Sequence, residues 1–297
     1  MLGTTCAQKA HYSATCTVVG LKESSSQLEI RASVSGRKLS GLKSHLVSGA
    51  RRVILLNDIS GSMAPQGEQD ISIGAVRDFA ELAPIDYQLA LINFNDQPHL
   101  DIGLGSVNEF RNAFNMPDLQ ARLKPHGATA LMDAVIAGLD HLAQTGSRDG
   151  DAIVILSDGL DNASSVRASE LRRRVAAAHA RLFLLTLRSA TGPGGSHSPF
   201  DVYEIVSASG GLVAMPRAIN QWMVDRPGDE GMITPKFDPK TIREKIEWIF
   251  IFVQQAERLD FDLDSPVTSP TSLKVNMTTT DHKRNSIRYA CPATLAP

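Results

Sequence analysis

The chain has 297 residues, which is enough for one large domain or two small ones. Hydrophobic residues make up 42% and charged residues 21%, so composition excludes a disordered or low-complexity chain. With 30 Lys and Arg against 32 Asp and Glu, the formal net charge is −2. Bulk charge therefore offers no basis for binding nucleic acid or an anionic membrane.

Cysteine content and apolar runs bear on the compartment. Cys6, Cys16 and Cys291 allow one disulfide with one cysteine left over, and a reducing compartment is the simpler interpretation. The longest purely apolar run near the C-terminus, residues 248–253, is far shorter than the roughly 20 residues that span a bilayer. No signal peptide is visible, so we expect no membrane insertion and a cytoplasmic location by default, or export if the natural N-terminus lies further upstream.

The first structural pattern along the chain is an alternation of apolar and polar residues over 27–34, which is typical of a strand with one solvated face. Near-continuous apolar runs follow, and they predict strands buried on both faces of a parallel sheet. These runs cover residues 53–56, 89–94, 152–156, 182–187 and 212–215. Helical periodicity separates them at 73–82, 131–142 and 166–179, with Gly146 as a stop for the second helix.

After these repeats, residues 224–239 predict a loop and 240–252 a helix. Alternation returns at 259–263 and 273–277, and more weakly at 287–290. The fold class predicted is a doubly wound, mostly parallel α/β sheet with small β flanks from both termini. The expected division is an N-terminal β segment over 1–50, the α/β domain over 51–256 and a C-terminal β segment over 257–297.

Five oxygen-bearing side chains are predicted to meet at one edge of the central sheet. Asp58, Ser60 and Ser62 follow the first buried strand, Thr129 precedes a helix, and Asp158 follows the strand at 152–156. Ligand sites of open α/β sheets lie at the carboxyl ends of the strands. Two carboxylates and three hydroxyls form a hard oxygen set that suits Mg²⁺ or Mn²⁺ rather than zinc.

In this order and at these strand ends, the three segments resemble the metal-ion-dependent adhesion site of von Willebrand factor type A domains. The resemblance covers residues 51–256. The C-terminal residues 258–266 and 272–276 are similar to the end of bacterial proteins related to this family. The resemblance to the adhesion site implies that Ser60 and Ser62 bind the metal directly and that Thr129 binds it directly or through water. Asp58 and Asp158 would act mainly through waters and hydrogen bonds, and a Glu or Asp of a protein partner would complete the metal shell.

Other polar residues near these segments have structural interpretations. Asp133 is expected to stabilise the first turn of its helix, and Asp161 and Asn162 to be loop residues near the sheet edge. Asn93 and Asp96 fit either a turn or a contact with metal-bound water, and His126 is expected to be a solvated loop histidine. The run of three arginines at 172–174 is expected to be a solvated helix face.

The sequence therefore predicts a Mg²⁺-dependent protein-binding module that is not an enzyme. One alternative is an accessory scaffold subunit of a larger complex, in which the metal is incidental. Another is a phosphatase with Asp58 as nucleophile, although such sites usually carry a second Asp where this chain has Ser60. The identity of the partner and the oligomeric state are left open.

Overall fold

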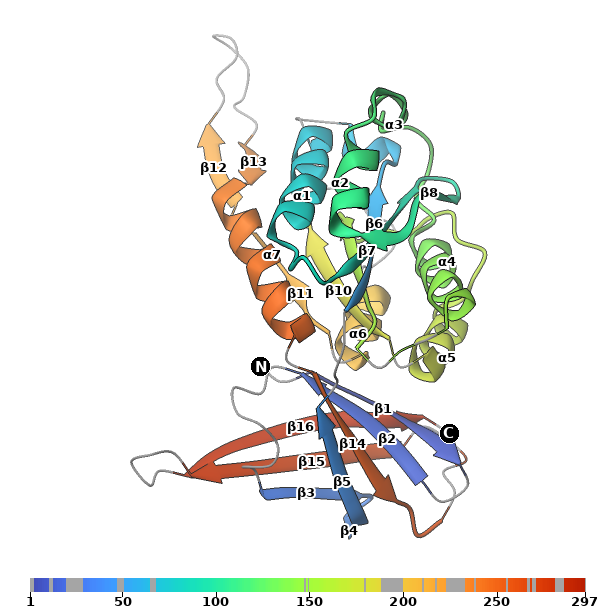
Figure 1. Ribbon diagram of the computed structural model, residues 1–297, viewed down its shortest axis with the longest axis vertical. Helices are drawn as coiled ribbons and strands as arrows, with labels where there is room; N and C mark the ends of the chain where they lie inside the picture. The colour runs from blue at the N-terminus through green and yellow to red at the C-terminus, as the bar shows by residue number, and fades with distance from the viewer. Residues whose placement is uncertain are drawn as a thin grey trace.

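The structure is a computed structural model. It describes residues 3–10, 13–19, 29–46, 51–64, 68–146, 148, 150–178, 180–187, 200–209, 211–216, 218–222, 233–237, 239–254, 256–265, 268, 271–280 and 286–296. Within these residues the strands form a six-stranded sheet, an eight-stranded sheet and a two-stranded hairpin (Figure 1). The six-stranded sheet carries the predicted site.

The six-stranded sheet has the order β11-β10-β9-β6-β7-β8, and β8 is its only antiparallel member. Every residue of β6, β9 and β10 is buried, as expected for strands covered on both faces. The strands are β6 (Arg52–Asp58), β7 (Gln88–Phe94), β8 (Pro98–Ser106), β9 (Ala152–Ser157), β10 (Arg181–Thr186) and β11 (Val213–Ala214).

Helices cover both faces of this sheet (Figure 1), and a separate apolar core lies between the sheet and the helices on each face. One face carries α1 (Glu68–Leu82), α2 (Val107–Phe114) and α7 (Pro239–Gln254), and the other carries α4 (Leu131–Gln144), α5 (Ala168–Ala178) and α6 (Phe200–Ala208). The short α3 (Pro117–Arg122) follows α2. The predicted doubly wound α/β fold is therefore confirmed.

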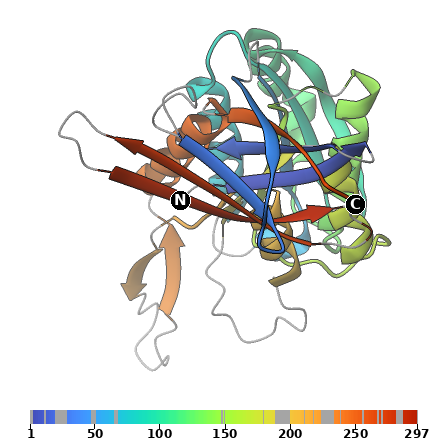
Figure 2. The same ribbon diagram turned by 90° about the horizontal axis from the view of Figure 1, so that it is seen from below.

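The eight-stranded sheet combines strands from both ends of the chain, in the order β4-β3-β15-β16-β1-β2-β14-β5. Its buried apolar residues include Ala32, Phe261 and Leu273. Figure 2 shows its blue and red strands crossing the base of the molecule. They are β1 (Gly3–Ala10), β2 (Ser13–Val19), β3 (Glu29–Val34), β4 (Arg37–Lys38), β5 (Ser40–Leu46), β14 (Ala256–Asp262), β15 (Thr271–Thr280) and β16 (Ser286–Ala296).

The two outermost strands of this sheet are consecutive in the chain. Only Leu39 separates β4 from β5, and its N–H donates to the carbonyl oxygen of Ala32 on β3. Because a single residue cannot cross a flat eight-stranded sheet, the sheet folds back on itself. In Figure 1, β5 and β14 accordingly cross over β3 and β15.

Some local predictions need correction. The segment 224–239 is not wholly a loop, because β13 (Ile233–Phe237) lies within it and pairs with β12 (Ala218–Trp222). Residues 223–232 lie outside the described part of the chain. The strand predicted at 212–215 is shortened to two residues, whereas Gly146 follows α4 with φ of 77°, as its role as a helix stop requires. Within the described residues, no helix combines the length and apolarity needed to cross a membrane.

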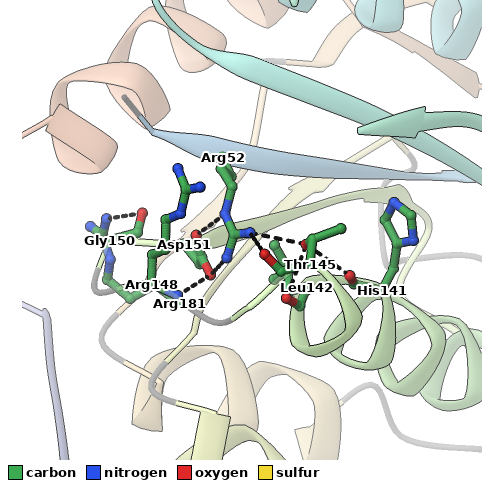
Figure 3. A network of polar contacts seen from close by, with 8 residues as sticks. All are labelled: Arg52, His141, Leu142, Thr145, Arg148, Gly150, Asp151 and Arg181. Atoms are coloured by element: carbon green, nitrogen blue, oxygen red, sulfur yellow. Dashed lines mark hydrogen bonds and ion pairs between the residues drawn. The ribbon is translucent and has the colours of Figure 1, made fainter. Parts of the chain in front are cut away.

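A network of hydrogen bonds and an ion pair lies at the amino ends of β6 and β9 (Figure 3). Arg52 and Asp151 form a buried ion pair, in which Nε of Arg52 donates to Oδ1 of Asp151 at 2.8 Å. The same guanidinium donates to Oγ1 of Thr145, and the N–H of Arg148 donates to Asp151. At this end of the sheet, the buried carboxylate is thus matched by an arginine.

Candidate metal site

Asp58 is the last residue of β6 and lies at the carboxyl end of the sheet, 1% exposed. Its Oδ1 accepts a hydrogen bond from the N–H of Ser60 at 2.9 Å, and its Oδ2 accepts one from Oγ of Ser157 at 2.6 Å. The carboxylate is therefore fixed between the turn that follows β6 and the end of the neighbouring strand β9.

The turn after Asp58 brings two hydroxyl groups together. Oγ of Ser60 and Oγ of Ser62 are 3.0 Å apart. Ser60 is fully buried, Ser62 is partly buried and Gly61 is exposed, so the pair lies just beneath the surface. The two oxygens share a side of the turn, as their spacing of two residues predicts.

Backbone hydrogen bonds attach this turn to the loop that precedes α4. The N–H of Gly61 donates to the carbonyl oxygen of Gly127 at 2.9 Å, and the N–H of His126 donates to that of Ile59 at 2.9 Å. Gly127 has φ of 78°, and a Cβ placed there would lie 2.2 Å from Oδ2 of Asp96. The positive φ and the close approach of the Asp96 side chain together favour a glycine at this position of the loop.

Thr129 is held in place by the loop after β9. Its N–H donates to Oδ1 of Asn162 at 2.8 Å, while its carbonyl oxygen accepts from the N–H groups of Asn162 and Ala163, both at 3.0 Å. Asp161 accepts from the N–H of Met132 in the first turn of α4. The predicted loop residues Asp161 and Asn162 thus position the start of α4, and Thr129 itself is buried.

Asp158 follows β9 and is also buried. Its Oδ1 accepts from the N–H of Leu160 at 3.0 Å, in a turn where Gly159 adopts φ of 82°. Ser157, which the sequence did not single out, joins the two acidic residues, because it precedes Asp158 and donates to Asp58. The sequence feature that could have identified Ser157 is its position at the end of a buried strand, directly before Asp158.

The surroundings of Asp58 disfavour the charged form of its carboxyl group. Burial raises its pKa to about 6, the hydrogen bonds from Ser157 and Ser60 oppose that shift, and the negative charge of Asp158 adds to it. Among the described residues, no Lys, Arg or His forms an ion pair with Asp58, in contrast to the Arg52–Asp151 pair at the other end of the sheet. A cation at this edge would supply the missing positive charge.

The structure thus links the five predicted site residues to different degrees. Ser60 is hydrogen-bonded to both Asp58 and Ser62. Thr129 lies in the loop that bonds to Gly61, and Asp158 acts on Asp58 through its charge. This donor set fits a hard divalent cation, because it consists of hydroxyl and carboxylate oxygens near a partly open turn. Among the described residues, no group of three or more His, Cys, Asp or Glu side chains is arranged to hold a metal.

The remaining polar residues near the site take structural roles. Asn93 donates to Asp101 and accepts from Asn57, Asp96 accepts from the N–H of Ala128, and His126 is exposed and bonded to Asn95. The carboxylate of Asp133, in the first turn of α4, accepts from the N–H groups of Ser165 and Val166 and so also fixes the segment before α5.

No protein-family model matches the chain, and no curated protein matches it. The solved structures similar to it include von Willebrand factor type A from Catenulispora acidiphila, at 11% identity over 99% of this chain and 74% of that chain, with a TM-score of 0.49. An aerotolerance-related membrane protein from Bacteroides fragilis has 12% identity over 69% and 98%, with a TM-score of 0.45. The PilB minor pilin from Streptococcus sanguinis has 13% identity over 86% and 78%, with a TM-score of 0.44. The similar structures from bacteria include a von Willebrand factor type A domain, which belongs to the family whose metal site the sequence motif resembles.

Proposed function

We propose that the chain is a protein-binding module that depends on Mg²⁺ or Mn²⁺. Ser60 and Ser62 would hold the cation through their hydroxyl oxygens, with Thr129 directly or through water and with Asp58 and Asp158 mainly through water. When bound, the cation supplies a positive charge that attracts a Glu or Asp side chain of the partner.

The observation that carries this proposal is the paired hydroxyl groups of Ser60 and Ser62, 3.0 Å apart beside the buried Asp58. Asp58 orients the pair, because it accepts from the N–H of Ser60 while Ser157 fixes its other oxygen. Because the two hydroxyls are neutral, a cation held by them keeps most of its charge for an incoming carboxylate. The exposed Gly61 leaves the turn accessible to a partner.

Partner capture by the immobilised full chain tests the proposal. Proteins retained in Mg²⁺ and released by a chelator are identified, and one is then purified and titrated against the chain. We expect the affinity to fall at least tenfold in chelator, in Ser62→Ala and when the critical Glu or Asp of the partner is changed to Gln or Asn. Ser169→Ala, on the exposed surface of α5, is the matched control and should bind as the unmodified chain does.

The alternatives predict different outcomes. Partner binding that is unchanged in chelator and in Ser62→Ala would favour a scaffold with an incidental metal and contradict the proposal. Turnover of a generic phosphoester in Mg²⁺ buffer, lost in Asp58→Asn, would favour the phosphatase.

A further inference from the structure

The eight-stranded sheet places two of the three cysteines opposite each other. β1 and β2 pair in antiparallel register from Gly3 opposite Val19 to Gln8 opposite Ala14, and within that run Cys6 lies directly opposite Cys16. The register is irregular only beyond Gln8, so this pair belongs to the regular part of the ladder. Directly opposed residues share one face of a sheet.

The backbone separation of such a pair suits a disulfide. Opposed residues in antiparallel strands have Cα atoms about 4.5 to 5.5 Å apart. Disulfide-bonded cysteines span Cα distances of roughly 4.4 to 6.8 Å. The register therefore brings Cys6 and Cys16 to bonding range without any change in strand pairing.

The third cysteine lies too far along its strand to compete. β16 runs parallel to β1 with Leu295 opposite Cys6, and Cys291 precedes Leu295 by four residues. At about 3.3 Å per residue, four residues correspond to roughly 13 Å along the strand. The register opposes Cys291 to Val275 on β15 instead.

We propose that Cys6 and Cys16 form a disulfide across β1 and β2 while Cys291 stays a free thiol. With oxidised glutathione as the oxidant, one thiolate attacks the glutathione disulfide, giving a mixed disulfide and releasing one glutathione thiolate. The second protein thiolate then displaces the other glutathione. The protein loses two electrons and two protons, and two molecules of reduced glutathione are formed.

The bond would cross-link a hairpin that contacts the α/β part of the molecule. β1 and β2 are interior strands of the eight-stranded sheet, and β1 also lies against α5 and α6 of the α/β part. A disulfide closing the short β1–β2 loop stabilises mainly by restricting the unfolded chain. We therefore expect the oxidised protein to unfold at a higher temperature than the reduced protein.

Peptide mapping of the full chain tests this pairing, because trypsin separates all three cysteines. Cleavage after Lys9, Lys22 and Arg288 places Cys6 in residues 1–9, Cys16 in 10–22 and Cys291 in 289–297. After treatment with oxidised glutathione and alkylation of free thiols, we expect peptides 1–9 and 10–22 to be linked, with the mass of two hydrogen atoms lost. Peptide 289–297 should carry the alkyl group.

Two variants serve as controls. Cys291→Ser should form the link to the same extent as the unmodified chain, whereas Cys16→Ser should lose both the link and the rise in unfolding temperature. Alkylation of all three cysteines after oxidation, or a link that includes Cys291, would overturn the proposal. Peptide mapping of the unmodified chain alone decides which cysteines are linked, so the test does not depend on whether the variants fold.

Discussion

Asn162 controls the backbone of Thr129 from both sides, since its side chain accepts from the N–H of Thr129 and its own N–H donates to the carbonyl oxygen. Asn162→Ala removes the acceptor. We expect a loss of about 1 kcal/mol in the free energy of unfolding and a several-fold weaker affinity for Mg²⁺. Denaturant unfolding and calorimetric Mg²⁺ titration measure the two effects.

The matched control for this variant is Asn112→Ala on the exposed surface of α2, which should change neither quantity. A loss of stability in Asn162→Ala with unchanged Mg²⁺ affinity would contradict the positioning of Thr129 for a metal.

His141 makes stability depend on pH. Its Nε2 accepts from the N–H of Leu104 at 3.3 Å, and burial, together with the charge of Arg52, lowers its pKa below the ordinary value of 6.5. As the pH falls through 6.5, the unfolded chain binds a proton before the native protein does, so stability is lost. We expect the unmodified chain to lose stability relative to His141→Gln as the pH falls from about 7 to 5. The control is His99→Gln, at an exposed position of β8, and an equal effect of both substitutions would argue against this role.

At the residue scale, the sequence identified side chains whose role follows from local spacing. Asp58, Ser60 and Ser62 alternate in one turn after a buried strand, so their common side could be predicted. The partnership of Ser157 with Asp58 could not, because it depends on β9 lying beside β6. Likewise, nothing within the loop of Asn162 reveals that it folds back onto Thr129.

At the scale of elements, the C-terminal end of α7 depends on two arginines. Nη1 of Arg181 donates to the carbonyl oxygen of Phe252 at 2.8 Å, Nη2 of Arg181 donates to that of Val253 at 3.1 Å, and Arg51 donates to those of Val253 and Gln254. These carbonyls belong to the last turn, where no intrahelical donor remains. Burial, reinforced by the charge of Arg51, lowers the pKa of Arg181 to about 9, which leaves it charged at neutral pH.

Replacing Arg181 tests this anchoring. Arg181→Met deletes the donors to the end of α7, and we expect unfolding by denaturant to show a loss of about 2 kcal/mol. Arg173→Met, whose side chain is 71% exposed, should be within about 0.5 kcal/mol of the unmodified protein. An Arg181→Met variant as stable as the unmodified chain would show that water or other groups satisfy these carbonyls.

Elements with strong periodicity were predictable, and weakly patterned ones were not. The central residues of β6, β9 and β10 are all apolar, and such unbroken runs indicate burial on both faces. The edge strand β8 was missed because two glycines and mixed polarity obscure its pattern. β1 and β2 were missed for a related reason, since small and hydroxyl-bearing residues replace the large apolar ones that define alternation.

At the scale of the whole molecule, the chain leaves and re-enters its β part at neighbouring points. Arg51, immediately before β6, bonds to the end of α7, and β14 starts at Ala256, two residues after α7 ends. We propose that residues 51–256 form the binding unit, with 1–50 and 257–297 forming the second unit. Alternation near both termini predicted that strands occur there, but pairing across more than 200 residues leaves no local signal.

We propose that Asp58 is buried in order to hold a cation and that its charge does not stabilise the metal-free fold. Because burial raises its pKa to about 6, the charged carboxylate costs stability at neutral pH. In chelator at pH 7, Asp58→Asn should therefore be as stable as the unmodified chain, or more stable by about 1 to 3 kcal/mol.

The most direct measurement is unfolding of the unmodified chain, Asp58→Asn and the exposed control Asp118→Asn, each in chelator and in Mg²⁺. We predict that Mg²⁺ stabilises the unmodified chain and Asp118→Asn, to a degree that rises with Mg²⁺ concentration, and leaves Asp58→Asn unchanged. A Mg²⁺ effect that is absent from the unmodified chain or equal in all three proteins, or a destabilised Asp58→Asn in chelator, would contradict a role of Asp58 in cation binding.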